Sequence, residues 1–357
     1  METTNHLFPW LELIDYPAFC VKNGIIVAVN SAAENRMLRV GADIWEVVTE
    51  HRSAYEEFKS GCLYLTITVG NLPCNASVTR MPECDVFLIQ RDADNDQLQA
   101  LALAAQQLRI PLANVMTTID RLFTSSDNTD EVTQQQANQI NRNLFQLLRI
   151  LGNMSDAGSY RSAFSATMQA TDLTAVIQEI IEKTQTISAN TGITITYTGP
   201  TAPVFGLANS EKLERAVYNL LSNALKFSPA GSTVDVKLTK NGNLLSLTVC
   251  NANAEPASEH SFWNRYGREP AIEDSRNGLG LGMTLVSTVA AVHGGTVLVD
   301  HPNPEETRVT MTIAIKNDNS GTVRSPALRI GDYAGGRDKA LLELSEILAP
   351  DSYEKIN

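Results

Sequence analysis

The sequence has no paired cysteines, no clustered histidines and no long apolar run, and each absence excludes a class of protein. Its 5 cysteines form no Cys-x-x-Cys pair, so we expect reduced structural thiols and neither a zinc site nor a redox site. Its 5 histidines lack the spacing of metal ligands, which leaves a metal hydrolase without support. The apolar runs fall short of the roughly 20 residues that a membrane-spanning helix needs, and the polar start METTNH does not resemble a signal peptide.

Positive charge is also scarce. The chain has 28 Lys and Arg against 40 Asp and Glu, a net charge of -12, and the sequence contains no local basic patch. Such a chain repels nucleic acid and anionic membranes, so we expect a cytoplasmic, soluble protein that binds neither. With 357 residues, of which 43% are hydrophobic, it is long enough for two or three domains of roughly 150 residues each.

Residues 1–92 have the pattern of a small module of strands and helices. An apolar run leads into Asn23-Gly24, the dipeptide of a tight hairpin turn, then a second strand through Val29 and a helix that begins near Asn30. Further strands are expected in 62–70 and 85–90. This order resembles the start of a PAS sensor domain; the alternative is a dimerisation spacer that binds no ligand.

Residues 93–158 predict a helical hairpin. In the first helix the apolar positions alternate three and four apart, which is a heptad seam that needs a partner helix. They are Leu98, Leu101, Ala105, Leu108, Leu112, Val115, Ile119 and Leu122. The partner follows the turn at 125–130 and runs to Gly158. Because a lone hairpin leaves part of the seam exposed, we expect a homodimer with a four-helix bundle.

Helices and strands alternate through residues 159–318, which predicts an α/β layer with helices on one face of a sheet. Two motifs stand in this region. In the first, NLLSNALKFSP, the residues Asn219, Asn223 and Lys226 lie at i, i+4 and i+7 and share a helix face. Amide oxygens suit a hard cation and an ammonium suits a phosphate, although an ordinary amphipathic helix has the same pattern.

The second motif is GLGLGM, with Gly278, Gly280 and Gly282 directly before a helix. Glycines at alternate positions let backbone N–H groups approach phosphate oxygens at the positive end of the helix. At the other end of that helix, His293 precedes two glycines. We interpret it as a helix C-terminal residue before a glycine cap, not as a ligand or base.

In this order and separation the two motifs resemble the N box and second glycine box of sensor histidine kinases, a branch of the GHKL ATPase superfamily. SFWNRYGR, between them, resembles the aromatic F box of the nucleotide lid. The resemblance implies Mg²⁺ and ATP as cofactors, with Asn223 as the metal ligand, Asn219 beside it, Lys226 on a phosphate and Phe227 near the nucleotide. The full set of nucleotide-binding residues that it implies is Asn219, Asn223, Lys226, Phe227, Asn251, Gly278, Gly280, Leu281, Gly282 and Met283.

The sequence departs from the family at the first glycine box. Asn251 stands where the family has the aspartate that accepts a hydrogen bond from the adenine amino group, and both glycines of that box are missing. An amide oxygen still accepts the bond, but loss of the charge costs about 1 kcal/mol, a factor of about ten in affinity. Without these glycines we expect a stiffer hinge for the lid.

The larger departure lies in the helical hairpin, in the segment LALAAQQLRIPLANV. Aligned with the family's phosphoacceptor segment on Arg109 and Pro111, the chain has Gln106 for the histidine, Gln107 for the acid and Ile110 for the threonine. Loss of a general base slows a reaction by about 10²–10⁴. Loss of the nucleophile abolishes it, because an amide nitrogen has its lone pair delocalised into the carbonyl, and isoleucine cannot orient a water for phosphatase activity.

We therefore expect a multidomain α+β protein: a PAS-like module at 1–92, a dimerising hairpin without the phosphoacceptor at 93–158, a GHKL-type α/β sandwich at 159–318, and a linker with a short helix at 319–357. The leading hypothesis is a histidine kinase homologue in two-component signalling that binds Mg-ATP without autophosphorylation and acts by conformation or on a partner. That partner is a response regulator or another histidine kinase. The alternatives are an active kinase that phosphorylates another site, and a scaffold with a vestigial nucleotide site. For the short helix near Lys339–Leu348, a docked tail and a partner-binding helix stay open.

Overall fold

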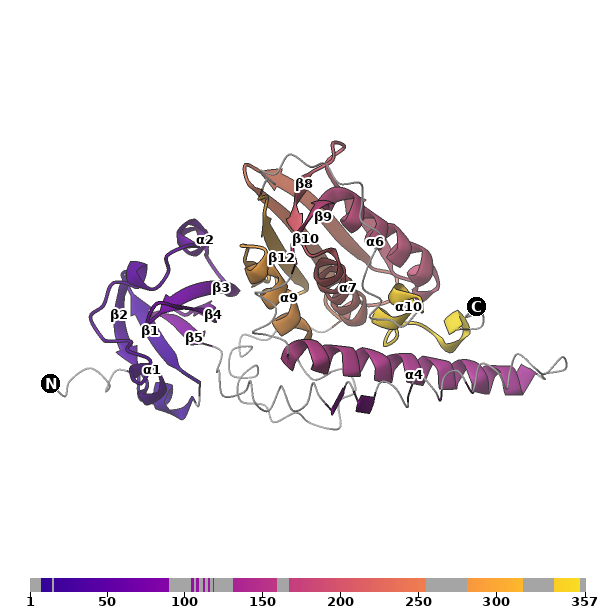
Figure 1. Ribbon diagram of the computed structural model, residues 1–357, viewed down its shortest axis with the longest axis horizontal. Coiled ribbons are helices and arrows are strands. Elements are labelled where there is room, and N and C mark those ends of the chain that lie inside the picture. The colour runs from indigo at the N-terminus through magenta and orange to yellow at the C-terminus, as the bar shows by residue number, and fades with distance from the viewer. Residues whose placement is uncertain are drawn as a thin grey trace.

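The computed structural model describes six continuous stretches of the chain and seven single positions between them. The stretches are 8–14, 16–89, 131–158, 167–254, 281–316 and 337–353, and the positions are 104, 105, 107, 108, 112, 115 and 118. Figure 1 shows an N-terminal module (8–89), an α/β domain (167–316), a long helix that runs beside that domain, and a short tail (337–353) between the two.

The N-terminal module is a five-stranded antiparallel sheet in the order β2-β1-β5-β4-β3. Its elements are η1 (Pro9–Leu13), β1 (Ala18–Lys22), β2 (Ile25–Val29), α1 (Ser31–Glu34), η2 (Ile44–Glu46), α2 (Arg52–Glu57), β3 (Cys62–Val69), β4 (Leu72–Arg80) and β5 (Asp85–Ile89). The predicted turn between β1 and β2 is confirmed, because Asn23 and Gly24 both have positive φ, at 52° and 78°.

Strand β4 is absent from the sequence reading, which predicts strands only at β3 and β5 in this part of the module. Its segment contains a proline and an asparagine within the first five residues, a composition that disfavours a strand. Pairing overrides the composition: β4 is hydrogen-bonded to β3 and to β5, and it joins β3 through Gly70 and Asn71, both with positive φ.

Asn30, the residue that ends β2, fixes the start of α1. Its buried side-chain oxygen accepts hydrogen bonds from the N–H groups of Ala33 and Ala18, both at 3.0 Å. Its side-chain nitrogen donates to the carbonyls of Ile14 (3.0 Å) and Tyr16 (2.7 Å). One asparagine therefore caps the helix and ties the segment before β1 to the sheet, which explains why the strand ends in this residue type.

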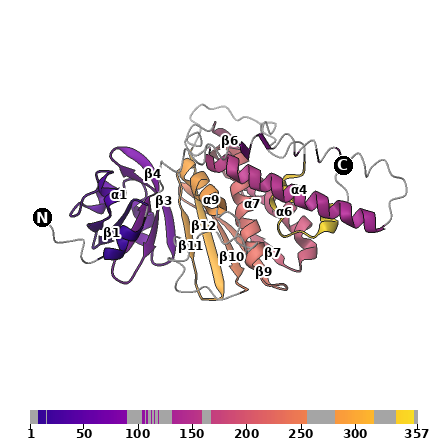
Figure 2. The same ribbon diagram turned by 90° about the horizontal axis from the view of Figure 1, so that it is seen from below.

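The α/β domain follows the predicted alternation of helices and strands. Its elements are β6 (Gln169–Asp172), α6 (Leu173–Ser188), η3 (Ala189–Thr191), β7 (Thr194–Thr198), β8 (Phe205–Ala208), α7 (Ser210–Phe227), β9 (Thr233–Asn241), β10 (Leu244–Ala252), α9 (Leu281–Val292), β11 (Val297–Asp300) and β12 (Glu306–Ala314). Helices α6, α7 and α9 cover one face of the sheet (Figure 2). Strands β6 and β8 form a small second sheet that the sequence did not predict.

One sheet runs through both parts of the molecule, in the order β2-β1-β5-β4-β3-β11-β12-β10-β9-β7. The two parts meet where β3 pairs antiparallel with β11, with Leu63 opposite Leu298. The approach is close at Gly61, which has a φ of +91°, because a Cβ on this residue would overlap the carbonyl oxygen of Val299. We call this contact the β3–β11 joint. The sequence predicts two separate modules here, and no local pattern indicates that their strands pair with each other.

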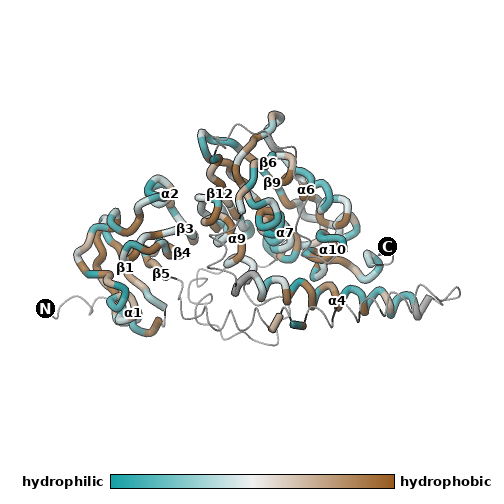
Figure 3. Tube along the Cα trace, in the orientation of Figure 1, coloured by the Kyte–Doolittle hydropathy of each residue, from teal (hydrophilic) through white to brown (hydrophobic). Residues whose placement is uncertain are grey.

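Hydrophilic and hydrophobic residues alternate along the helices, including α4, as expected for helices with one buried face (Figure 3). The α/β domain and the long helix α4 (Glu131–Gly158) share one core, in which Phe145, Leu213 and Leu247 are buried. The N-terminal module has its own core, centred on the stacked rings of Phe19 and Phe87 at 4.6 Å between centroids. In the described part of the chain no helix is long and apolar enough to cross a membrane.

The tail forms α10 (Lys339–Glu343) and η4 (Pro350–Tyr353) and packs on α4, α6 and α7. Leu344 and Leu348 are buried in the shared core, and Leu341 is partly buried against it. Of the two alternatives open for this segment, the docked tail is therefore confirmed.

Candidate nucleotide-binding site

Helix α7 carries the first motif, and its local sequence fixes where the helix begins. The side chain of Asn209 caps it by accepting a hydrogen bond from the N–H of Lys212 at 3.0 Å. Asn219 is 1% exposed, and its side-chain nitrogen donates to the carbonyl oxygen of Arg215 at 2.9 Å. This bond orients the amide and leaves its oxygen on the other side. Asn223, one turn further on, is only half-buried.

The second glycine motif lies directly against these two asparagines. A Cβ on Gly282 would stand 3.1 Å from Oδ1 of Asn219 and 3.8 Å from Nδ2 of Asn223. In the sequence 48 residues separate these motifs, and the packing of α9 on α7 brings them together. A larger residue at 282 would press on the oxygen of Asn219, so glycine permits the close approach of the two helices.

Gly282 and Met283 lie in the first turn of α9, which begins at Leu281. The first N–H groups of a helix have no partner within it and form the positive end of its dipole, a favourable place for a phosphate. Gly278 and Gly280 of the predicted set, and the F box, lie outside the described residues.

His293 holds the far ends of the two helices together. Its Nδ1 lies 2.7 Å from the carbonyl oxygen of Val289, and its Nε2 accepts from the N–H of Asn209 at 3.1 Å, so the ring is neutral with the proton on Nδ1. Burial is the main cause that lowers its pKa. Gly294 follows with a φ of +68°. The prediction of a helix C-terminal residue before a glycine cap is confirmed, with the added link to the cap of α7.

On the predicted adenine side, Asn251 is buried at the end of β10. Its side-chain nitrogen donates to the carbonyl of Ala252 at 2.8 Å, which leaves the amide oxygen as its acceptor. The backbone beyond is tied down: the N–H of Ala254 donates to the carbonyl of Phe227 at 3.0 Å. The segment that replaces the first glycine box is therefore held to the end of α7, beside Phe227, whose side chain is 45% exposed.

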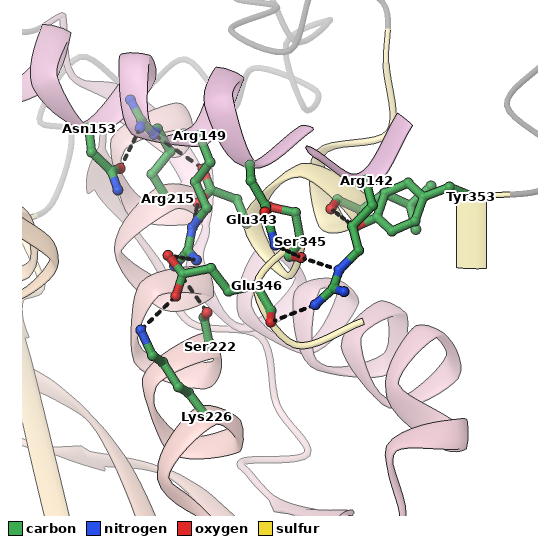
Figure 4. A network of polar contacts seen from close by, with 12 residues as sticks. Arg142, Arg149, Asn153, Arg215, Ser222, Lys226, Glu343, Ser345, Glu346 and Tyr353 are labelled. Atoms are coloured by element: carbon green, nitrogen blue, oxygen red, sulfur yellow. Dashed lines mark hydrogen bonds and ion pairs between the residues drawn. The ribbon is translucent and has the colours of Figure 1, made fainter. Parts of the chain in front are cut away.

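Lys226, the predicted phosphate contact, already has an anionic partner. Its Nζ lies 2.8 Å from Oε2 of Glu346 in the tail (Figure 4). Two buried arginines complete the surroundings, Arg149 of α4 and Arg215 of α7. The sequence did not predict this cluster of charged residues. One sign of it was Arg149, a charged residue inside an apolar stretch of α4.

The phosphoacceptor segment is described only in part. Gln107 is helical and exposed, whereas Gln106, Arg109, Ile110 and Pro111 lie outside the described residues. In the described stretches, no group of three or more His, Cys, Asp or Glu side chains is placed to hold a metal ion. Asn219 and Asn223 carry amide oxygens, a type of ligand that Mg²⁺ accepts.

Residues 208–317 match the family described as histidine kinase-, DNA gyrase B-, and HSP90-like ATPase. The chain is 26% identical over 222 residues to sensor histidine kinase CusS of Escherichia coli O6:H1, an alignment that covers 60% of this chain and 44% of that protein. It is 32% identical over 118 residues to sensor histidine kinase YcbM of Bacillus subtilis (strain 168), covering 32% of this chain and 38% of that protein. The chain thus spans less than half the length of both curated relatives.

Among solved structures, the crystal structure of ShkA full-length in complex with AMPPNP aligns with a TM-score of 0.48 and 20% identity, over 61% of this chain and 46% of that one. The family match contains α7, β10 and α9, the elements on which the N box, Asn251 and Gly282 lie. The sequence relatives extend the likeness beyond that match, to 60% of the chain. Residues 208–317 therefore form a GHKL-type ATPase domain in a mixed α/β multidomain chain, 60% of which is similar in sequence to a sensor histidine kinase.

Proposed function

We propose that this chain is a signalling member of the two-component class that binds Mg-ATP but does not phosphorylate its own helical hairpin. The observation that carries the nucleotide half of the proposal is the contact of Gly282 with Asn219 and Asn223. It supports the proposal because the side-chain oxygen of Asn219, with Asn223 next to it, lies beside the first turn of α9, and a triphosphate with its metal needs oxygen ligands close to such N–H groups.

Each residue of the site has a distinct part in this proposal. Asn223, with Asn219 beside it, holds Mg²⁺, which neutralises phosphate charge when bound. The first turn of α9 binds phosphate oxygens through the N–H groups of Gly282 and Met283. The amide oxygen of Asn251 accepts the adenine amino group, and the exposed ring of Phe227 forms a wall of the base site.

The part of the proposal that excludes phosphorylation of the hairpin rests on the types of residue in its phosphoacceptor segment. An amide nitrogen at Gln106 has no lone pair available to attack phosphorus, and Gln107 has no basic oxygen of carboxylate strength. Ile110 has no polar atom to direct a water. Signal transfer would then take place through conformation or through contact with a response regulator or another kinase.

Dimerisation is part of the same proposal. In the first hairpin helix Leu108 and Val115 are exposed, and in α4 Ile140 and Leu147 are exposed while Leu144 faces the α/β domain. An apolar face of this kind, on helices that already use another face for packing, is suited to a second copy of the hairpin. For the N-terminal module the strand order β2-β1-β5-β4-β3 supports a PAS-like sensor, with an interior filled by Phe19 and Phe87.

Binding of a fluorescent ATP analogue with Mg²⁺ tests the nucleotide half. We expect saturable binding by the natural chain and a loss of at least about tenfold in Asn223→Ala, because a cation ligand and its charge-assisted contacts disappear. Asn241→Ala, at the exposed end of β9, is the matched control and should bind like the natural chain. Equal binding by all three proteins would contradict the site.

The intact contact between the two motifs also favours a second candidate, a kinase that phosphorylates another site or a partner. Incubation with [γ-³²P]ATP separates the two, because phosphohistidine is labile in acid and stable in base. Transfer of such label, to this chain or to a candidate response regulator, would establish the active enzyme. A melting temperature unchanged by Mg-ATP would instead indicate the scaffold with a vestigial site, since ligand binding stabilises the native state.

A further inference from the structure

The tail lies in the angle between α4 and α7 and contacts both helices through charged groups (Figure 4). Glu343 lies between two arginines, with oxygen to nitrogen distances of 3.5 Å to Arg149 of α4 and 3.4 Å to Arg215 of α7. Glu346 repeats the arrangement, at 3.1 Å from Arg149 and 2.8 Å from Lys226 of α7. Each carboxylate therefore joins the same pair of helices.

Hydrogen bonds to backbone carbonyls and a ring contact secure the same segment. The side chain of Gln146 donates to the carbonyl of Ser345 at 3.0 Å, and Arg142 donates to the carbonyl of Glu346 at 3.3 Å. The ring of Tyr353 packs on Phe145 with 5.1 Å between centroids. The tail is thus docked along α4 over several turns and does not depend on one contact.

The two carboxylates differ in how easily they can leave. The side chain of Glu343 is 0% exposed, so its departure would strand two buried arginines. The side chain of Glu346 is 31% exposed and can turn into water while the apolar residues of the tail, Leu344 and Leu348, remain in the core. Glu343 therefore anchors the tail, whereas another anion can displace the carboxylate of Glu346 from its cationic partners.

The partner that Glu346 would release is Lys226, the lysine assigned to a phosphate. A carboxylate and a phosphate oxygen compete for the same ammonium group, because both are anionic acceptors. Resting on the proposed nucleotide site, we propose that the tail is a built-in inhibitor of that site: Glu346 occupies Lys226 and holds α4 against α7, and the phosphates of Mg-ATP displace it. Nucleotide binding then breaks one of the two carboxylate links between α4 and α7, while Glu343 keeps the other.

Nucleotide affinity measured in a double-mutant cycle tests this coupling. We expect Glu346→Gln to bind the fluorescent ATP analogue with Mg²⁺ about three- to tenfold more tightly than the natural chain, since an anionic competitor is removed. Glu57→Gln, an exposed glutamate of α2, removes the same charge far from the site and should change nothing. In a Lys226→Ala background the Glu346→Gln change should no longer alter affinity.

The outcomes separate the inference from the function on which it rests. Nucleotide binding that is equal in the natural chain and in Glu346→Gln overturns the inhibitory tail and leaves the nucleotide site standing. No binding by any variant, Glu346→Gln included, overturns both. A gain that persists in the Lys226→Ala background also overturns the inference, because the effect would then be one of general charge.

Hydrogen exchange supplies a readout that does not depend on affinity. In the natural chain, saturating Mg-ATP should speed amide exchange in residues 345–347 and leave the buried Leu342–Leu344 segment and Leu348 protected. Binding without any change in exchange at 345–347 would contradict displacement of Glu346. Melting curves of each variant verify that it is folded at the assay temperature.

Discussion

The α/β domain is attached to the rest of the chain in two different ways. On one side, the β3–β11 joint consists of backbone hydrogen bonds between strands, with apolar side chains such as Leu298 packed on the core of the N-terminal module. On the other side, the tail is held by buried carboxylates and guanidinium groups. A backbone ladder is indifferent to pH and salt, whereas charge pairs respond to both, so the second attachment is the adjustable one.

The largest effect is expected at the buried end of the tail. Glu343→Gln removes the charge shared by Arg149 and Arg215; Arg149 keeps Glu346, but buried Arg215 loses this carboxylate, so we expect a loss of about 3–5 kcal/mol in the free energy of unfolding. Glu56→Gln is the control, since its pair with Arg52 is exposed and worth less than about 1 kcal/mol. Urea denaturation measures both, and equal losses would mean that charge does not hold the tail.

The next effect tests the β3–β11 joint. Gly61→Ala combines a positive φ with an overlap against the carbonyl of Val299, so we expect a loss of about 3 kcal/mol and faster amide exchange in β11. Gly231→Ala has a similar φ, +81°, but open space around the new methyl group, and should cost only about 1 kcal/mol. Identical losses in the two variants would show that the strands do not meet as closely as this.

The pH dependence should distinguish the two attachments. Burial alone would raise the pKa of Glu346, but the charges of Arg149 and Lys226 outweigh it and hold that pKa below its ordinary value. The stabilisation by this carboxylate is therefore complete above its ordinary pKa and is lost as the pH falls through the lowered one.

The unfolding free energy of the natural chain should accordingly approach that of Glu346→Gln between about pH 7 and about pH 3. The difference between the natural chain and Gly61→Ala should stay constant over the same range, because no titrating group takes part in that change. A difference for Glu346→Gln that does not shrink on acidification would argue against the ion pairs.

The smallest effect belongs to the rim of the tail. The Nζ atom of Lys183 in α6 lies 3.0 Å from a carboxylate oxygen of Asp338, and the two side chains are 40% and 35% exposed. We expect Lys183→Ala to cost less than about 1 kcal/mol. Asp338→Ala should cost about 1 kcal/mol more, because Asp338 also caps α10 through the N–H of Ala340 at 2.8 Å. Thermal melts resolve the two, and the reverse order would contradict the cap.

Local features were predictable because neighbouring residues determine them. Asn23-Gly24 dictates its hairpin, the helix face of Asn219 and Asn223 follows from a spacing of four, and His293 before Gly294 marks the end of a helix. Strand β4 could not be predicted in this way, because its stability comes from pairing with β3 and β5 and not from its own composition.

The long-range contacts could not be predicted from the sequence for a related reason. A pair such as Arg149 and Glu343 joins residues almost two hundred positions apart, and each of them alone looks like any charged residue of a surface helix. The glycine motif beside the N box was foreseen as a resemblance, but the contact of Gly282 with Asn219 needed the packing of α9 on α7.

The β3–β11 joint bears on how this protein can be divided for study. A fragment that begins after the N-terminal module leaves Val297, Leu298 and Val299 with one unpaired side, and a fragment that ends before residue 90 does the same to residues 62–64. Unpaired edge strands with apolar side chains recruit further strands and aggregate. Poor solubility of either half alone would then reflect the cut itself and not a failure to fold, and only fragments that retain both strands would avoid it.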